Sequence, residues 1–92
     1  MIFRTIFAGE LAYQRLGDSI IDLNEMKTSG QFRGYKWANG PTAETQIGIL
    51  IVCVYSPDWI CQIFIPISVS PQVYLRGYQV SKWGPWKRCS II

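Results

Sequence analysis

Two runs of apolar residues in the middle of the chain predict its most regular structure. Residues 47–55 are almost entirely apolar and rich in Ile and Val, which favours a strand covered on both faces. Ser56, Pro57 and Asp58 follow as a tight turn, and residues 59–65 resume the apolar run. The pattern therefore predicts an antiparallel hairpin whose two strands are in register.

A shorter strand is predicted before the hairpin. Residues 22–30 are polar and end in a glycine, which is typical of a turn. Alternation over residues 31–37 then places two sets of side chains on opposite faces, Phe32, Gly34 and Lys36 against Arg33, Tyr35 and Trp37. Residues 38–46 contain Asn-Gly-Pro-Thr and are predicted to form the loop into the hairpin.

Further β-structure is predicted after the hairpin. Prolines bound the connection at 66–71, and a strand is expected at 73–80. A turn flanked by two tryptophans leads into a short final strand. The predicted fold is therefore mainly β, a small antiparallel β-meander or sandwich-like knob over residues 22–92. In the strand at 73–80, alternation sets Val73 and Leu75 against Tyr74, Arg76 and Tyr78.

The first 21 residues follow a different pattern. Their apolar residues recur at spacings of three to five, closer to a helical period than to alternation, and two glycines interrupt them. We expect a short, partly helical or irregular segment, which either caps the sheet or acts as an attachment and oligomerisation arm. The candidate interface residues in it are Ile2, Phe3, Ile6, Phe7 and Leu11.

The composition indicates that the chain works as an oligomer. Apolar residues make up 49% of the 92 positions and charged residues only 16%, against about 25% charged in an average soluble domain. A chain this short buries only roughly 60% of its unfolded surface when it folds alone. The surplus of apolar side chains therefore favours burial between subunits.

Several kinds of chemistry are missing from the sequence. It has no histidine, so Ser-His and Cys-His nucleophiles and imidazole metal ligands are excluded. Neither a phosphate-binding loop nor a dinucleotide fingerprint occurs, and the six acidic residues are scattered, with turn solvation explaining Asp22 and Glu25 better than catalysis does. We therefore predict a non-enzymatic protein with no metal and no cofactor.

The cysteines and the apolar runs bear on the compartment. Cys53, Cys61 and Cys89 include no C-x-x-C pair, and the first residues do not form an export signal, so free and buried thiols are expected. Cys53 and Cys61 fall in adjacent predicted strands and could face each other. No apolar run approaches the roughly 20 residues of a membrane helix, so we expect no membrane insertion.

Aromatic residues are the informative class for binding. Tyr and Trp suit cores, subunit interfaces and sugar stacking alike, and some alternate here with basic residues. On one strand face such a row could hold a saccharide, an anionic polymer or another subunit, whereas the alternative is that the rings fill the core. The candidate ligand-binding residues are Arg33, Tyr35, Lys36, Trp37, Tyr74, Arg76, Tyr78, Trp83 and Trp86.

An ordered set of motifs between residues 22 and 88 resembles the pyocin-knob family, the C-terminal knob domains of phage tail fibres and related virion proteins. Each motif alone is weak, and their order carries the resemblance. In chain order they are Asp22-Leu23-Asn24, Gly30, the strand around Tyr35, Asn39-Gly40-Pro41-Thr42, Val54-Tyr55, Trp59-Ile60-Cys61-Gln62, Val73-Tyr74-Leu75-Arg76 and Trp83-Gly84-Pro85-Trp86-Lys87.

This resemblance implies a phage structural protein assembled in the host cytoplasm and carried on the virion as a homotrimer. It implies possible contact with host cell-surface polysaccharide, and docking to other virion proteins through the N-terminal segment. Family members usually end a much longer fibre chain, whereas this sequence begins about 20 residues before the motifs, so a head fibre, decoration or tail-tip protein is also expected.

The alternative function is a small β-rich nucleic-acid-binding module. Bases would stack on the row formed by Arg33, Tyr35, Lys36 and Trp37, as they do on small β-barrels. The net charge of +3 argues against this alternative, because the basic residues are scattered along the chain rather than massed in one region.

Overall fold

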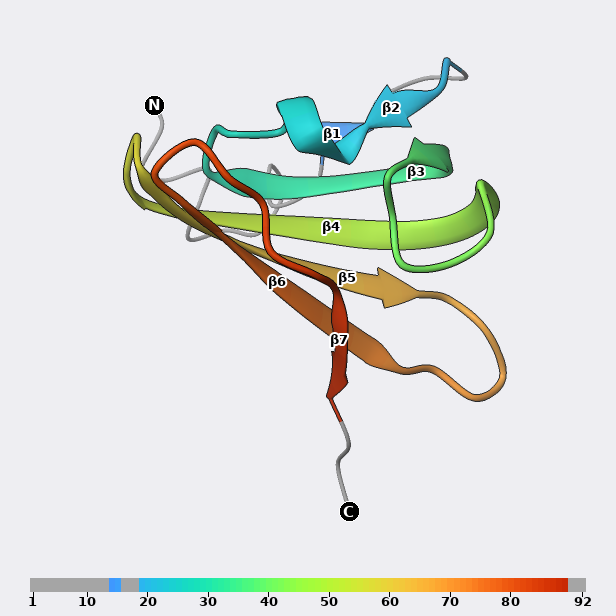
Figure 1. The fold of residues 1–92 in the computed structure, drawn as a ribbon. Coiled ribbons are helices and arrows are strands. Elements are labelled where there is room, and N and C mark those ends of the chain that lie inside the picture. Colours follow the sequence, from blue (N-terminus) through green and yellow to red (C-terminus); the bar gives the residue numbers. More distant parts are fainter. Residues whose placement is uncertain (1–13, 16–18, 90–92) are drawn as a thin grey trace, which may run out of the picture.

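A single twisted sheet forms the body of the protein. The computed structural model describes residues 14–15 and 19–89. Seven described strands pair in the order β1-β3-β4-β5-β6-β7, with β2 also pairing with β3 (Figure 1). The strands are β1 (Gln14–Arg15), β2 (Ile21–Asp22), β3 (Gly30–Ala38), β4 (Thr45–Ser56), β5 (Trp59–Pro66), β6 (Val73–Gln79) and β7 (Lys87–Cys89), and a 3-10 helix, η1 (Leu23–Glu25), follows β2.

The predicted mainly β meander is confirmed. From β3 to β7 each strand pairs antiparallel with the next one in the chain, and the turn around Pro57 closes the β4–β5 hairpin. The short strands β1 and β2 both pair parallel with β3. Within the described residues, no helix has the length and apolar character needed to cross a membrane.

Most of the predicted N-terminal segment lies outside the described residues. This applies to the expected helical pieces before residue 14 and to all five candidate interface residues, Ile2, Phe3, Ile6, Phe7 and Leu11. The described chain resumes at residue 19 and leads through β2 into η1. Asp22 caps η1, because its carboxylate accepts a hydrogen bond of 2.9 Å from the backbone N–H of Asn24.

The core lies on one face of the sheet, which we call the inner face. η1 brings Leu23 onto this face, and the connection between β6 and β7 brings two tryptophans. Trp37 meets Phe64 edge-on, with 5.1 Å between ring centroids. The buried residues of this core are Leu23, Phe32, Trp37, Leu50, Val52, Ile60 and Phe64.

A register shift between β3 and β4 corrects the predicted facing of Trp37. Simple alternation placed Trp37 with Arg33 and Tyr35, but the pairing shifts between Gly34 and Lys36, where β4 carries one more residue than β3. Beyond this irregularity Trp37 lies on the inner face, where its ring is 2% exposed and its Nε1 donates a 2.7 Å hydrogen bond to the carbonyl of Gln46.

The opposite, outer face of β4 corrects a second expectation. Residues 47–55 were expected to be covered on both faces, but Ile47 is 65% exposed and Tyr55 is 90% exposed. The main contacts between described elements are those within the sheet and those of η1 with β3. Within the described part of the chain, therefore, only the inner face is covered by other elements.

Candidate functional site

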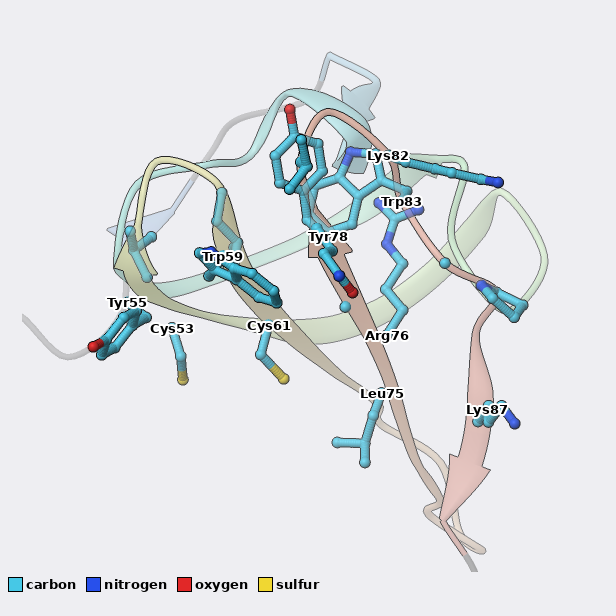
Figure 2. A pocket seen from close by; sticks show the side chains of 17 residues that line it. Cys53, Tyr55, Trp59, Cys61, Leu75, Arg76, Tyr78, Lys82, Trp83 and Lys87 are labelled. Carbon is cyan, nitrogen blue, oxygen red and sulfur yellow. The ribbon is translucent and has the colours of Figure 1, made fainter.

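Five of the predicted ligand-binding residues come together on the inner face. Alternation in β6 was predicted correctly, because Tyr74, Arg76 and Tyr78 share the inward side. Figure 2 shows Arg76 and Tyr78 on this side of the strand and Leu75 on the other. The guanidinium of Arg76 lies 4.0 Å from the ring centroid of Trp83 and 4.6 Å from that of Trp86. Two indole rings therefore hold one cation.

A hydrogen-bond network that runs through Gln62 also fixes the position of Arg76. Its Nε donates to Oε1 of Gln62 at 2.9 Å. Gln62 is fully buried, and its Nε2 donates to the carbonyls of Leu23 at 2.8 Å and Met26 at 2.9 Å. The same network therefore links β6, β5 and the turn that contains η1. The indole rings of Trp83 and Trp86 cover the Arg76 end of this network.

The enclosure of Arg76 limits what this cluster can bind. Arg76 is 7% exposed, and its buried Nη2 has no hydrogen-bond partner among the residues that the structure describes. Burial lowers the pKa of Arg76 to about 10, and the negative charge of Asp22 acts in the opposite direction, so the group is cationic at neutral pH. The cluster is best described as a structural cation cage, because its charge is covered by protein.

The other four predicted residues do not form one surface. Arg33 is exposed and Tyr35 partly buried, and both line a shallow depression on the outer face with Ile47 and Ile49. Nζ of Lys36 lies 5.5 Å from the Tyr35 ring centroid. Trp37 is separated from them in the core, so its ring cannot serve as an exposed stacking platform.

Aliphatic side chains gather on the outer face of the central strands. Cross-strand pairing sets Ile49 opposite Ile65, and Ile51 opposite Ile63. These four are partly buried, and the neighbouring Ile47 is largely exposed. We call this set, Ile47, Ile49, Ile51, Ile63 and Ile65, the isoleucine face. A contiguous apolar patch of this kind is typical of an interaction surface.

An open groove of about 1110 Å³ runs beside the hairpin tip, from the outer face of β4 and β5 to the β6–β7 connection (Figure 2). We call it the hairpin-tip groove. Tyr55 and Trp59 line it and are 90% and 47% exposed, and Lys82 and Lys87 supply positive charge. Among the residues that the structure describes, its lining contains no acidic side chain, and it includes Arg76, Tyr78 and Trp83 from the predicted set.

Sequence reasoning missed the exposed residues of this groove. Tyr55 was assigned to a strand expected to be covered on both faces, Trp59 was assigned to the returning strand, and the thiols were expected to be free and buried. All three cysteines, Cys53, Cys61 and Cys89, are free, but they are exposed. The available signal was the alternation around the turn at Pro57, which places Cys53, Tyr55, Trp59 and Cys61 on one face.

Within the described residues, no three Cys, Asp or Glu side chains gather to hold a metal ion.

The comparisons with known proteins identify a likeness of fold. No family model matches the chain, and no curated protein is significantly similar to it in sequence. The fold is similar to a solved structure of the P. aeruginosa R1 pyocin fibre comprising its C-terminal residues 323–701. The TM-score is 0.68 with 23% sequence identity, over 84% of this chain and 21% of the fibre chain.

The chain thus spans about a fifth of the fibre chain that it matches. At this level of identity the likeness concerns the fold. The motif resemblance noted in the sequence therefore has a structural counterpart, since a segment of a pyocin fibre folds in the same way as this sheet.

Proposed function

We propose that this protein is a non-enzymatic, fibre-type structural module of a phage virion or phage tail-like particle that assembles as a homotrimer. The observation that carries the proposal is the isoleucine face on a sheet whose fold is shared with a segment of a pyocin fibre. Packing this face against other copies would remove from water the apolar area that the described elements leave open.

The acidic residues give a non-enzymatic role further support. Asp22 caps η1 and also accepts a 2.7 Å hydrogen bond from Nδ2 of Asn39. Its carboxylate is therefore engaged in holding the turn that carries Leu23 into the core. The proposed assembly would place the module on the virion, with other virion proteins as further partners through residues 1–21.

Light scattering coupled to size-exclusion chromatography tests the assembly. We expect about three times the chain mass of 10.5 kDa at micromolar concentration. Ile51→Lys should give a folded monomer, because Ile51 lies in the middle of the isoleucine face and its removal should not disturb the inner core. Val69→Lys is the matched control, since Val69 is fully exposed in the β5–β6 connection. A wild-type monomer or dimer would contradict the trimer.

We further propose that the hairpin-tip groove binds an anionic saccharide on the host surface. Exposed aromatic rings offer stacking platforms for sugar faces, and the two lysines complement acidic groups, with no acidic residue among the described residues of the lining. The predicted binding residues Arg76, Tyr78 and Trp83 contribute to the walls, with Arg76 acting through the charge it adds at the site rather than by direct contact.

A polysaccharide array with acidic and neutral glycans of bacterial surfaces tests this second part. Trp59→Ala should lose about 5- to 150-fold in affinity for the acidic glycans, since one stacked ring contributes roughly 1–3 kcal/mol. Val69→Ala should bind as the wild type does. If single-stranded DNA binds more tightly than every glycan, with a steep dependence on salt, the nucleic-acid function replaces the saccharide one.

A further inference from the structure

Two free cysteines face each other at the hairpin tip. Cys53 in β4 is the direct cross-strand partner of Cys61 in β5, and both are exposed. Their side chains leave the same face of the sheet, with the sulfur atoms directed to the same side (Figure 2). The third cysteine, Cys89, pairs with Val73 at the far edge of β6 and is not a cross-strand partner of either.

The sheet geometry suits a covalent bond between this pair. Directly opposed residues in antiparallel strands have Cα atoms about 4.5–5.5 Å apart. A disulfide accepts Cα separations of about 4.4–6.8 Å. The two thiols can therefore be joined without moving either strand, which distinguishes them from cysteines that only share a surface.

We propose that Cys53 and Cys61 are a modification site, a dithiol that a small-molecule disulfide such as oxidised glutathione converts into a cross-strand disulfide. One thiolate attacks the glutathione disulfide, forming a mixed disulfide and releasing a glutathione thiolate. The second thiol loses its proton and attacks the protein sulfur, forming the Cys53–Cys61 bond and releasing the second glutathione thiolate. Two protein thiols are oxidised, and one glutathione disulfide is reduced to two thiols.

The surroundings of Cys53 and Cys61 determine how fast the disulfide forms and what it changes. Although Cys61 is exposed, partial burial of its side chain raises the pKa of its thiol, and the nearby Cys53 raises it further, so little Cys61 thiolate is present at neutral pH. The reaction should therefore accelerate as pH rises from 7 to 9. Both sulfurs line the hairpin-tip groove, so the modification changes the lining of that groove from two thiols to one disulfide. This inference does not depend on the proposed assembly or ligand.

Alkylation and mass spectrometry of the full chain test the proposal. The reduced protein is incubated with oxidised glutathione at pH 8, quenched with iodoacetamide and digested with trypsin. No Lys or Arg lies between positions 36 and 76, so Cys53 and Cys61 fall in one tryptic peptide and Cys89 falls in another. We expect the peptide 37–76 to be two hydrogen atoms lighter and unalkylated, while Cys89 carries no link to either cysteine.

Single variants separate pairing from general reactivity. Cys53→Ser and Cys61→Ser should each stop at a stable mixed disulfide with glutathione, whereas Cys89→Ser should still form the internal bond at the wild-type rate. The proposal is overturned if peptide 37–76 remains doubly alkylated or doubly glutathionylated, or if Cys89 is the partner. It is also overturned if the bond forms equally fast in denaturing urea, because sequence proximity rather than strand pairing would then explain it.

Discussion

Replacing Gln62 with Met should remove a large part of the stability of the fold. Gln62 is fully buried, and its amide bonds the carbonyls of Leu23 and Met26 and the Nε of Arg76. The Leu23 carbonyl also accepts a 3.2 Å hydrogen bond from the N–H of Met26, so the Met26 carbonyl and the Arg76 Nε are the two groups that depend on Gln62. Met has a similar volume and fills the site, so the change deletes hydrogen bonds more than packing. Each buried group left without a partner costs about 1–3 kcal/mol. With two such groups, the free energy of unfolding should fall by at least about 2 kcal/mol.

Urea unfolding followed by tryptophan fluorescence measures this loss, at one fixed protein concentration for all variants. Gln79→Met is the matched control, because Gln79 is exposed on the neighbouring strand, and we expect a change within about 0.5 kcal/mol there. The dependence on urea should keep its slope, since the same surface is exposed on unfolding. A loss below about 1 kcal/mol for Gln62→Met would refute the network as a source of stability.

A double-mutant cycle measures how much of the lost stability comes from the contact between Gln62 and Arg76. Arg76→Met removes the buried cation together with its hydrogen bond to Gln62. Because the two side chains touch, the double variant should be less destabilised than the two single losses added together, by about 0.5–3 kcal/mol. Strict additivity would mean that the 2.9 Å contact contributes nothing, and that the two carbonyls alone explain the effect of Gln62.

Two further substitutions test local packing and backbone strain, with the same unfolding assay. Gly48→Ala should destabilise the fold by about 1–3 kcal/mol, because the added Cβ would lie 2.7 Å from the ring tip of the fully buried Phe64. An unchanged midpoint would show that this ring can move aside. Val80→Asn should stabilise it by about 1 kcal/mol, since Val80 is exposed at a φ of 46°, a left-handed conformation that Asn tolerates better than a β-branched residue. Destabilisation instead would mean that the Val80 side chain contributes packing that outweighs the strain.

The order of the strands from β3 to β7 was predictable from sequence, because each signal for it is local, whereas the short strands β1 and β2 were not predicted. Ile- and Val-rich runs favour strands, and Pro57 with its neighbours marks the turn between β4 and β5. Alternation in β6 also gave the correct facing of Tyr74, Arg76 and Tyr78. These features depend on residues within one turn or one strand of each other, so a pattern of period two is sufficient to find them.

The candidate site was less predictable, because its determinants are not local. A register shift between β3 and β4 after Gly34 moves Trp37 from the predicted surface row into the core, and it depends on the pairing of two strands rather than on the alternation within one. The enclosure of Arg76 depends on Trp83 and Trp86, which return to it from beyond the end of β6. The sequence supplied a cation and aromatic rings, but long-range pairing decided that they cover one another.

The polar groups of the inner face explain how β4 keeps its register. A strand that is apolar on both sides, as β4 is, specifies its register weakly, because a slip of one residue exchanges one set of apolar side chains for another. Residues that tolerate only one register must therefore prevent such a slip between β4 and β5. Gln62 fixes β5, since only on the inner face can its amide reach the carbonyls of Leu23 and Met26. Gly48 then fixes β4, because no larger residue fits against Phe64. Because these two residues set the register, the isoleucine face is not needed to hold the two strands in place. The number of isoleucines on the outer face therefore has another explanation, and burial between subunits would supply it.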